Sequence, residues 1–246
     1  MKAIFATLLR ELQATFFSPL AYAVATFFLL INGYVFWFIV SYLNNPQAAI
    51  GAPLELFFGQ TVFFWLVLLF ITPVGTMRAL AEERRSGTIE VLMTAPVTAG
   101  QVVVGKYLAA LAFFACLWLP TLAYVGIVAY HGEVDWGPIA SGYLGTIGVG
   151  ALFLAVGIFA SCLARNQIVA AVLTFAVLIV LFTFGLLENL VNQELAKEVF
   201  GYLDLWRHME EFSKGIVDTR HLVYYLSSIG FFLFLATQAL ETRKWR

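Results

Sequence analysis

The sequence predicts an all-α polytopic membrane protein, with six transmembrane helices in one domain over residues 1–246. Two observations predict this fold class. Of the 246 residues, 61% are hydrophobic and only 12% are charged, about half the charged fraction of a soluble domain. The charges are also clustered, and the uncharged runs between them are long enough for the roughly 20 helical residues that cross a bilayer. This composition excludes a soluble enzyme, a nucleic-acid-binding protein and a disordered chain.

Six uncharged runs predict the six spans. The first is expected near residues 20–43. The other five lie between charged or histidine residues, in chain order Glu55 to Arg78, Lys106 to Glu133, Asp135 to Arg165, Arg165 to Glu188, and His221 to Glu241. A large soluble core with six buried helices would need a far larger polar shell than 14 Lys and Arg and 15 acidic residues can build.

The distribution of charge predicts the orientation of the spans. Ten of the 14 Lys and Arg residues fall on the side that holds both termini, and ten of the 15 acidic residues fall on the other side. Because basic residues concentrate in cytoplasmic connections, both termini are expected in the cytoplasm. No cleavable signal peptide is apparent, since the first apolar run starts too far from Met1 and is too long.

Residues 1–18 are expected to form an amphipathic helix along the inner membrane surface. One face of this helix carries the apolar residues Ile4, Phe5, Leu8, Leu9, Leu12 and Phe16. Ser18-Pro19 then interrupts the helix before the first span. A simple cytoplasmic extension of the first span is the alternative.

The predicted spans have no Asp, Glu, Lys or Arg near their middles, and all three histidines fall outside them. Ionisable groups in the membrane usually mark ion or proton routes, so the sequence disfavours an ion-coupled carrier and an intramembrane enzyme. Neither the histidines nor the two cysteines, Cys116 and Cys162, have the spacing of a metal or redox motif. No catalytic, cofactor-binding or metal-binding residue is predicted.

Polar and small residues within the spans are candidates for helix interfaces or for a transport pathway. Asn32 places an amide near the middle of the first span, where a partner on another helix is expected. Contact of Asn32 with a transported molecule is the alternative. The fourth span carries small residues interpreted as helix-packing positions: Ser141, Gly145, Gly148, Gly157 and Ser161.

Residues 100–106 fit the first seven positions of a phosphate-binding loop, but the match fails at the eighth. Tyr107 stands where Ser or Thr would coordinate magnesium, and no strand is expected before the segment. Thr98 and Gln101 instead predict a capping box at the start of the third span. The chain is therefore expected not to bind ATP itself.

The connection at residues 78–99 combines charge, a bend and a short apolar helix. Ser86-Gly87 permits a bend, and a short helix is expected from residue 88 to residue 94, with Pro96 ending it. Its apolar residues, Ile89, Leu92 and Met93, would need a partner protein to cover them outside the membrane.

The charges before this bend are candidates for steering that partner. They are Glu82, Glu83, Arg84 and Arg85. An ordinary solvated charge run is the alternative interpretation.

Two motifs resemble those of the ABC-2 type transporter permeases, in particular their gliding-motility-type branch. The first is Glu82-Glu83-x-x-x-Gly87-Thr88-Ile89-Glu90-x-Leu92-x-x-x-Pro96-Val97, followed by Gly105-Lys106. The second is His208-x-Glu210-x-Phe212-x-Lys214-Gly215-x-Val217-Asp218. The resemblance covers essentially the whole chain.

This resemblance implies a non-catalytic membrane subunit of an ATP-driven, exporter-like transporter in the bacterial cytoplasmic (inner) membrane. ATP and Mg would be bound by a separate ABC ATPase subunit, present in two copies, and a second permease chain would complete a homo- or heterodimer. A coupling helix would dock in a groove of that ATPase. The residues to which the resemblance assigns this role are Gly87, Thr88, Ile89, Glu90, Leu92, Met93, Thr94 and Pro96.

The long outer connection, residues 188–221, is expected to form two short amphipathic helices partly inserted into the outer membrane face. The first would carry Leu187, Leu190, Val191 and Leu195, and the second Leu205, Trp206, Met209 and Phe212. Candidates for a gate, or for contact with an accessory subunit that has an extracytoplasmic domain, are Trp206, His208, Glu210 and Asp218. A solvated polar rim is the alternative for the last three.

Two questions of function stay open at this point. A membrane scaffold that transmits force, or assembles a cell-envelope or gliding complex, is the alternative to a transporter. A continuous polar cavity between two copies would favour transport, and a dry interface would favour the scaffold. Phe, Leu, Tyr and small residues along the spans suit an amphiphilic cargo, but ordinary aromatic packing has the same composition.

Overall fold

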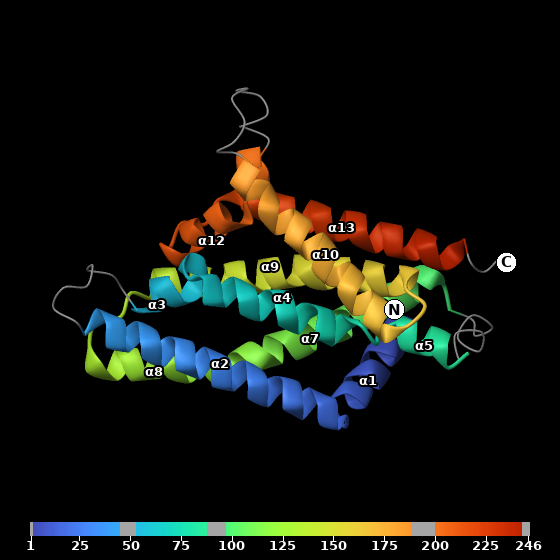
Figure 1. Cartoon of the computed structure of the whole chain (residues 1–246), viewed down its shortest axis with the longest axis horizontal. Helices are drawn as coiled ribbons and strands as arrows, with labels where there is room; N and C mark the ends of the chain where they lie inside the picture. The colour runs from blue at the N-terminus through green and yellow to red at the C-terminus, as the bar shows by residue number, and fades with distance from the viewer. Residues whose placement is uncertain (1, 45–52, 88–96, 188–199, 243–246) are drawn as a thin grey trace.

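The structure is a computed structural model that describes residues 2–44, 53–87, 97–187 and 200–242. All regular secondary structure in these ranges is helical, and six segments are long and apolar enough to cross a membrane. This confirms the predicted all-α fold class with six spans (Figure 1).

The chain begins with two separate helices. α1 covers Lys2–Phe16 and α2, the first span, covers Pro19–Leu43. Ser18 between them has an extended backbone, and Pro19 at the first helical position starts α2. α1 is therefore not a continuation of the first span, and its position on a membrane surface stays a prediction.

The second span is preceded by a bent segment. α3 (Pro53–Glu55) leads into the π-helical turn η1 (Leu56–Gln60), where Gly59 adopts φ +84°. A Cβ at Gly59 would lie 2.6 Å from Met209 Cβ, so glycine is needed both for the conformation and for the close contact. α4 (Val62–Thr76) and α5 (Ala81–Arg85) then form the second span and its charged end.

The third span consists of α7 (Ala99–Trp118), the 3₁₀ turn η2 (Leu119–Thr121) and α8 (Leu122–His131). The predicted capping box is confirmed: Gln101 N–H donates to Thr98 Oγ1, and Thr98 N–H donates to Gln101 Oε1. The helix begins at Ala99, directly after Thr98, as the capping box predicts. The uncharged run that starts at Lys106 covers only the later part of the span. Lys106 lies within it and is only 3% exposed.

The fourth span, α9 (Trp136–Leu163), is the central helix. In its most apolar window 78% of residues are buried within the protein, against 50% or less in the other five spans. α4, α7, α10, α12 and α13 all pack against it. The glycines of α9 make this possible, since a Cβ at Gly150 would lie 2.2 Å from Phe114 Cε1.

The last elements are α10 (Gln167–Leu187), α12 (Leu205–Ser213) and α13 (Thr219–Glu241). α12 confirms the second helix expected in the long connection, while Leu190, Val191 and Leu195 lie outside the described residues. Its apolar side, Leu205, Met209 and Phe212, is fully covered by the protein. This side therefore contacts η1 and α9 rather than lipid. Insertion of α12 into the outer membrane face stays a prediction.

The two ends of the bundle carry different elements. The start of α1, α5 and the last turns of α13 lie at one end, while α3 and α12 lie toward the other (Figure 1). The first turn of α1, the last turns of α13 and α5 thus share one end, as the charge pattern predicts. Which end faces the cytoplasm stays a prediction.

Candidate functional site

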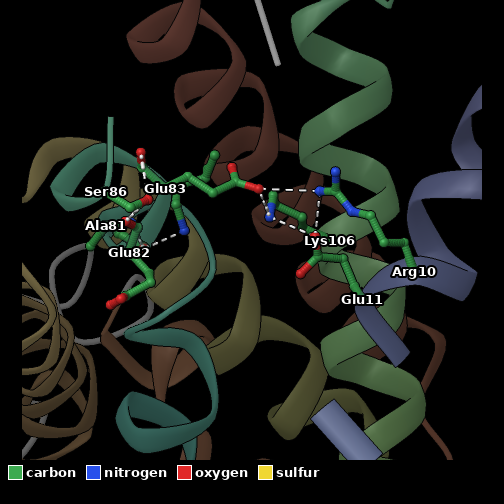
Figure 2. A network of polar contacts seen from close by, with 9 residues as sticks. Arg10, Glu11, Ala81, Glu82, Glu83, Ser86 and Lys106 are labelled. Atoms are coloured by element: carbon green, nitrogen blue, oxygen red, sulfur yellow. Dashed lines mark hydrogen bonds and ion pairs between the residues drawn. The ribbon is translucent and has the colours of Figure 1, made fainter. Parts of the chain in front are cut away.

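Four charged residues meet beside α5 and form a cluster that we call the ionic junction: Arg10, Glu11, Glu83 and Lys106. Lys106 Nζ lies 2.9 Å from Glu11 Oε1 and 2.9 Å from Glu83 Oε1. Arg10 Nη2 lies 2.7 Å from Glu11 Oε1 and 3.1 Å from Glu83 Oε1. Figure 2 shows these side chains arriving from three different elements, α1, α5 and α7.

The junction is balanced in charge, with two cations and two carboxylates. The Lys106 side chain is only 2% exposed, so its charge needs close anions to offset the lost hydration. Burial by itself raises the pKa of Glu11. Lys106 and Arg10 lower it by more than burial raises it, so the net pKa lies below its ordinary value of 4.5. The hydrogen bond to Glu11 raises the pKa of Arg10 despite partial burial. Both shifts favour the charged forms.

Gly105 explains how α1 comes close enough to α7 for these pairs to form. A Cβ at Gly105 would lie 2.8 Å from Thr7 Cβ and 3.2 Å from the backbone oxygen of Ile4. Only a residue without a side chain allows this crossing. The next residue, Lys106, is thereby brought within reach of Glu11.

α5 is also bound to the carboxyl end of the central helix. The backbone N–H groups of Leu80 and Ala81 donate to Ser161 Oγ at 3.0 and 3.1 Å. The Arg84 guanidinium donates to the carbonyls of Ala164, at 2.8 Å, and of Cys162. The last carbonyls of a helix have no partners within the helix and favour a nearby cation. Arg84 therefore caps α9 from α5.

α5 is followed by an exposed glycine with a left-handed backbone. Gly87 has φ +73° and is exposed, and its missing Cβ would meet nothing within 4 Å. This agrees with the predicted bend at Ser86-Gly87. The other residues assigned to the coupling helix, Thr88, Ile89, Glu90, Leu92, Met93, Thr94 and Pro96, lie outside the described residues.

The four charges expected to flank a docking site have different positions in the structure. Glu83 and Arg84 make the internal contacts described above. Arg85 is exposed. Glu82 is partly buried and lines a cavity of about 310 Å³ that lies beside the ionic junction, between α1, α2, α4, α5 and α7.

The candidate pathway residues are packed inside the bundle. Asn32 is 4% exposed, and its Nδ2 donates to the Phe28 carbonyl of its own helix at 2.9 Å. The amide thus finds a partner one turn away, whereas a partner on another helix was expected. Cβ atoms at Gly145 and Gly148 would lie 2.7 Å from Phe212 and 2.9 Å from Tyr225. Both glycines therefore lie at helix interfaces.

The outer candidates differ in exposure. Trp206 is partly buried and stacks on Trp65 with ring centroids 5.8 Å apart. His208 is 1% exposed, and burial, followed by the neighbouring His221, lowers its pKa to about 3. Glu210 pairs with Lys214 at the surface, and Asp218 caps α13 by accepting from Arg220 N–H at 2.8 Å.

Sequence reasoning missed a second cluster, at the junction of α12 and α13. Glu211, Asp218 and His221 each present a carboxylate oxygen or imidazole nitrogen within 4.8 Å of the others. They come together because the turn between the two helices, with Gly215 at φ +86°, brings their ends side by side. Their spacing matches no short metal motif, so only the fold reveals the cluster.

Comparison with known proteins adds the family. The family model described as "ABC-2 family transporter protein" matches residues 38–236. The chain belongs to the ABC-2 transporter family. This ABC-2 permease is thus a multi-pass membrane subunit of an ABC transporter, and it is non-catalytic because the ATPase of such transporters is a separate ABC protein. A comparison with curated proteins gave no match. The matched region of the permease includes α5 and α12 but leaves α1 outside.

Proposed function

We propose that this permease belongs to an exporter-like transporter in which residues 87–96 receive the motion of the ATPase subunit. Two ATPase copies and a second permease chain would complete the assembly in the bacterial inner membrane, with both termini in the cytoplasm. The proposal gives ATP and Mg to the partner. The permease chain contributes the mechanical connection between the ATPase and the spans.

The observation that carries this proposal is the way α5 is held. It runs directly into Gly87, and its contacts reach α7 through Lys106 and α9 through Arg84 and Ser161. A force applied to residues 87–96 would therefore act on the third and fourth spans. Without these contacts, residues 87–96 could move about the bend at Gly87 without moving the spans.

Coupling of this kind needs two states in which the ATPase binds differently. The ionic junction is suited to a change of state because its partners are shared. Glu83 Oε1 contacts both Lys106 and Arg10, so movement of α5 can weaken one ion pair while another is retained. The cost of breaking a buried ion pair completely is then avoided.

Co-purification of the ATPase subunit tests the docking role. Ile89→Asp and Leu92→Asp should each abolish co-purification while leaving the amount of permease in the membrane unchanged, because a carboxylate cannot be buried in an apolar groove without a partner. Ile216→Asp is the matched control, since Ile216 is an exposed apolar residue between α12 and α13, away from α5. Undiminished ATPase binding in both Ile89→Asp and Leu92→Asp would contradict the proposal.

Reconstitution tests the exporter role separately. Proteoliposomes that contain the permease and its ATPase should move a labelled amphiphile across the bilayer only when ATP and Mg are supplied. Turnover of ATP in a stable complex, with no movement of any amphiphile or solute, would instead favour the force-transmitting scaffold.

A further inference from the structure

The turn between α12 and α13 gathers three ligand-type side chains from two elements. Glu211 lies in the last turn of α12, Asp218 is the N-cap of α13, and His221 lies in the first turn of α13. Asp218 and His221 share one side of the helix start because they are three residues apart. Their carboxylate oxygens and imidazole nitrogen, with that of Glu211, are all within 4.8 Å of one another.

We propose that Glu211, Asp218 and His221 form a binding site for a divalent transition-metal ion, of which Zn²⁺ fits the ligand set best. Zinc binds imidazole nitrogen and carboxylate oxygen at about 2.0–2.2 Å, and three protein ligands leave one coordination position open. The three donor atoms already lie within 4.8 Å of one another. Hard ions such as Mg²⁺ prefer all-oxygen sites, so the imidazole disfavours them.

The contact between His221 and Glu211 is the first observation that supports a metal. His221 Nε2 lies 2.7 Å from Glu211 Oε2, so a proton occupies the space between the two atoms. A metal ion would replace this proton and bind both atoms, with the proton released to solvent. The two atoms that would bind the metal thus already lie next to each other.

The second observation is a buried imidazole nitrogen at the site that has no hydrogen-bond partner. His221 Nδ1 is buried and has no such partner among the described residues. The neighbouring His208 is 1% exposed, its ring centroid lies 3.9 Å from that of His221, and the Tyr202 backbone is a polar neighbour of its ring. Buried polar atoms without partners are costly. Part of the His221 imidazole is therefore left unsatisfied beside the proposed ligands.

The nearby cations leave room for a metal. Arg207 approaches Glu211 at 3.5 Å, but its side chain is 57% exposed and is easily displaced. Lys214 forms an ion pair with Glu210 instead. Among the described residues, the proposed site therefore holds two carboxylates and one weakly held cation, Arg207. A bound ion would fasten α12, which lies against the central helix, to the start of the sixth span.

Direct metal titration tests the site. The full chain, purified in detergent and freed of any affinity tag, is titrated with Zn²⁺ in competition with a chromophoric chelator. We expect one Zn²⁺ per chain, with affinity at least about tenfold weaker in Glu211→Gln, Asp218→Asn and His221→Asn. Asp218→Asn is the most informative of these variants, because Asn caps a helix as well as Asp does and the fold should be kept.

Matched controls identify the site by position. Glu133→Gln removes an exposed carboxylate between α8 and α9, and His131→Asn removes an exposed histidine at the end of α8, so both should bind Zn²⁺ as the unchanged protein does. Absence of stoichiometric Zn²⁺ binding to the unchanged protein would overturn the proposal. So would equal affinity in Asp218→Asn and the unchanged protein, or an equal loss in Glu133→Gln and Glu211→Gln.

Discussion

Lys106 on α7 and Glu83 on α5 form an ion pair at 2.9 Å, although the Lys106 side chain is only 2% exposed. The pair joins the third span to the short helix that runs directly into Gly87. Both residues also contact α1, Lys106 through Glu11 and Glu83 through Arg10. α1 is thus tied to the same point from which the proposed coupling segment leaves the bundle.

Lys106→Met should destabilise the permease. The substitution removes the buried cation from Glu11 and Glu83, whereas Arg10, which also pairs with both, is exposed. Breaking a buried ion pair costs about 3–5 kcal/mol, and the partial exposure of both carboxylates reduces the expected loss to about 1–3 kcal/mol. Thermal unfolding in detergent, followed by tryptophan fluorescence, measures the loss. Lys214→Met, which breaks an exposed ion pair with Glu210, is the control and should leave the Tm unchanged.

Lys106→Met also tests transmission of motion. If the ionic junction carries force from residues 87–96 to the spans, this variant should still bind the ATPase subunit but should transport less per ATP hydrolysed. An unchanged ratio of transport to hydrolysis, measured on the same proteoliposomes, would restrict the junction to a structural role.

Arg84→Gln should loosen the carboxyl end of α9. The guanidinium donates to the carbonyls of Cys162, Leu163 and Ala164, and the substitution removes these hydrogen bonds from the end of the central helix. Charged hydrogen bonds and helix-end charges together predict a loss of about 1–2 kcal/mol. Hydrogen exchange in the last turn of α9 should become faster. Arg85→Gln, at an exposed neighbouring position, should exchange as the unchanged protein does.

Much of this fold could be predicted from local features of the sequence. The spans follow from uncharged runs, and the capping box at Thr98 and Gln101 depends only on residues three apart. Hydropathy could not identify the central helix, because α9 and α10 have mean hydropathies of 2.2 and 2.7 while 78% and 22% of their windows are buried. The burial of a helix depends on its neighbours, and in the sequence only the glycines of α9 indicated close packing around this helix.

The contacts of charged residues depend on tertiary structure and were harder to predict. Lys106 was expected to mark the edge of a span, because a lone charge inside one is costly. The structure places it within α7, where Glu11 and Glu83 offset that cost. In the same way, Glu211 and His221 are ten residues apart in sequence, yet the turn after α12 makes them partners.

The stability that Glu11 contributes should depend on pH. Its pKa is lower in the folded protein than the ordinary value of 4.5, so its charged form stabilises the fold above about pH 4.5. This contribution is lost as the pH falls through the lower, folded-state pKa. The Tm difference between the unchanged protein and Glu11→Gln should therefore be largest near neutral pH and shrink toward about pH 4. A difference that is constant over this range would show that Glu11 acts through packing alone.

Gly157→Ala should disrupt the contact between the central helix and the second span. A Cβ at Gly157 would lie 2.1 Å from Thr76 Oγ1 and 2.7 Å from Thr76 Cβ. Rotation of the Thr76 side chain cannot relieve the second overlap, because Cβ is attached to the backbone. α4 must therefore shift, and overpacking of this kind costs about 1–3 kcal/mol.

Gly126→Ala is the matched control, since a Cβ there would meet nothing within 4 Å of its position in α8. Replacing a helical glycine at an open site restricts the unfolded chain and should raise stability by up to about 1 kcal/mol. The two variants make the same chemical change, so opposite shifts in Tm would isolate the packing effect.

Because Thr76 lies just before α5, Gly157→Ala should also shift α5 and weaken its hydrogen bonds to Ser161. A lower Tm with unchanged hydrogen exchange at Leu80 and Ala81 would confine the effect to the contact of α4 with α9.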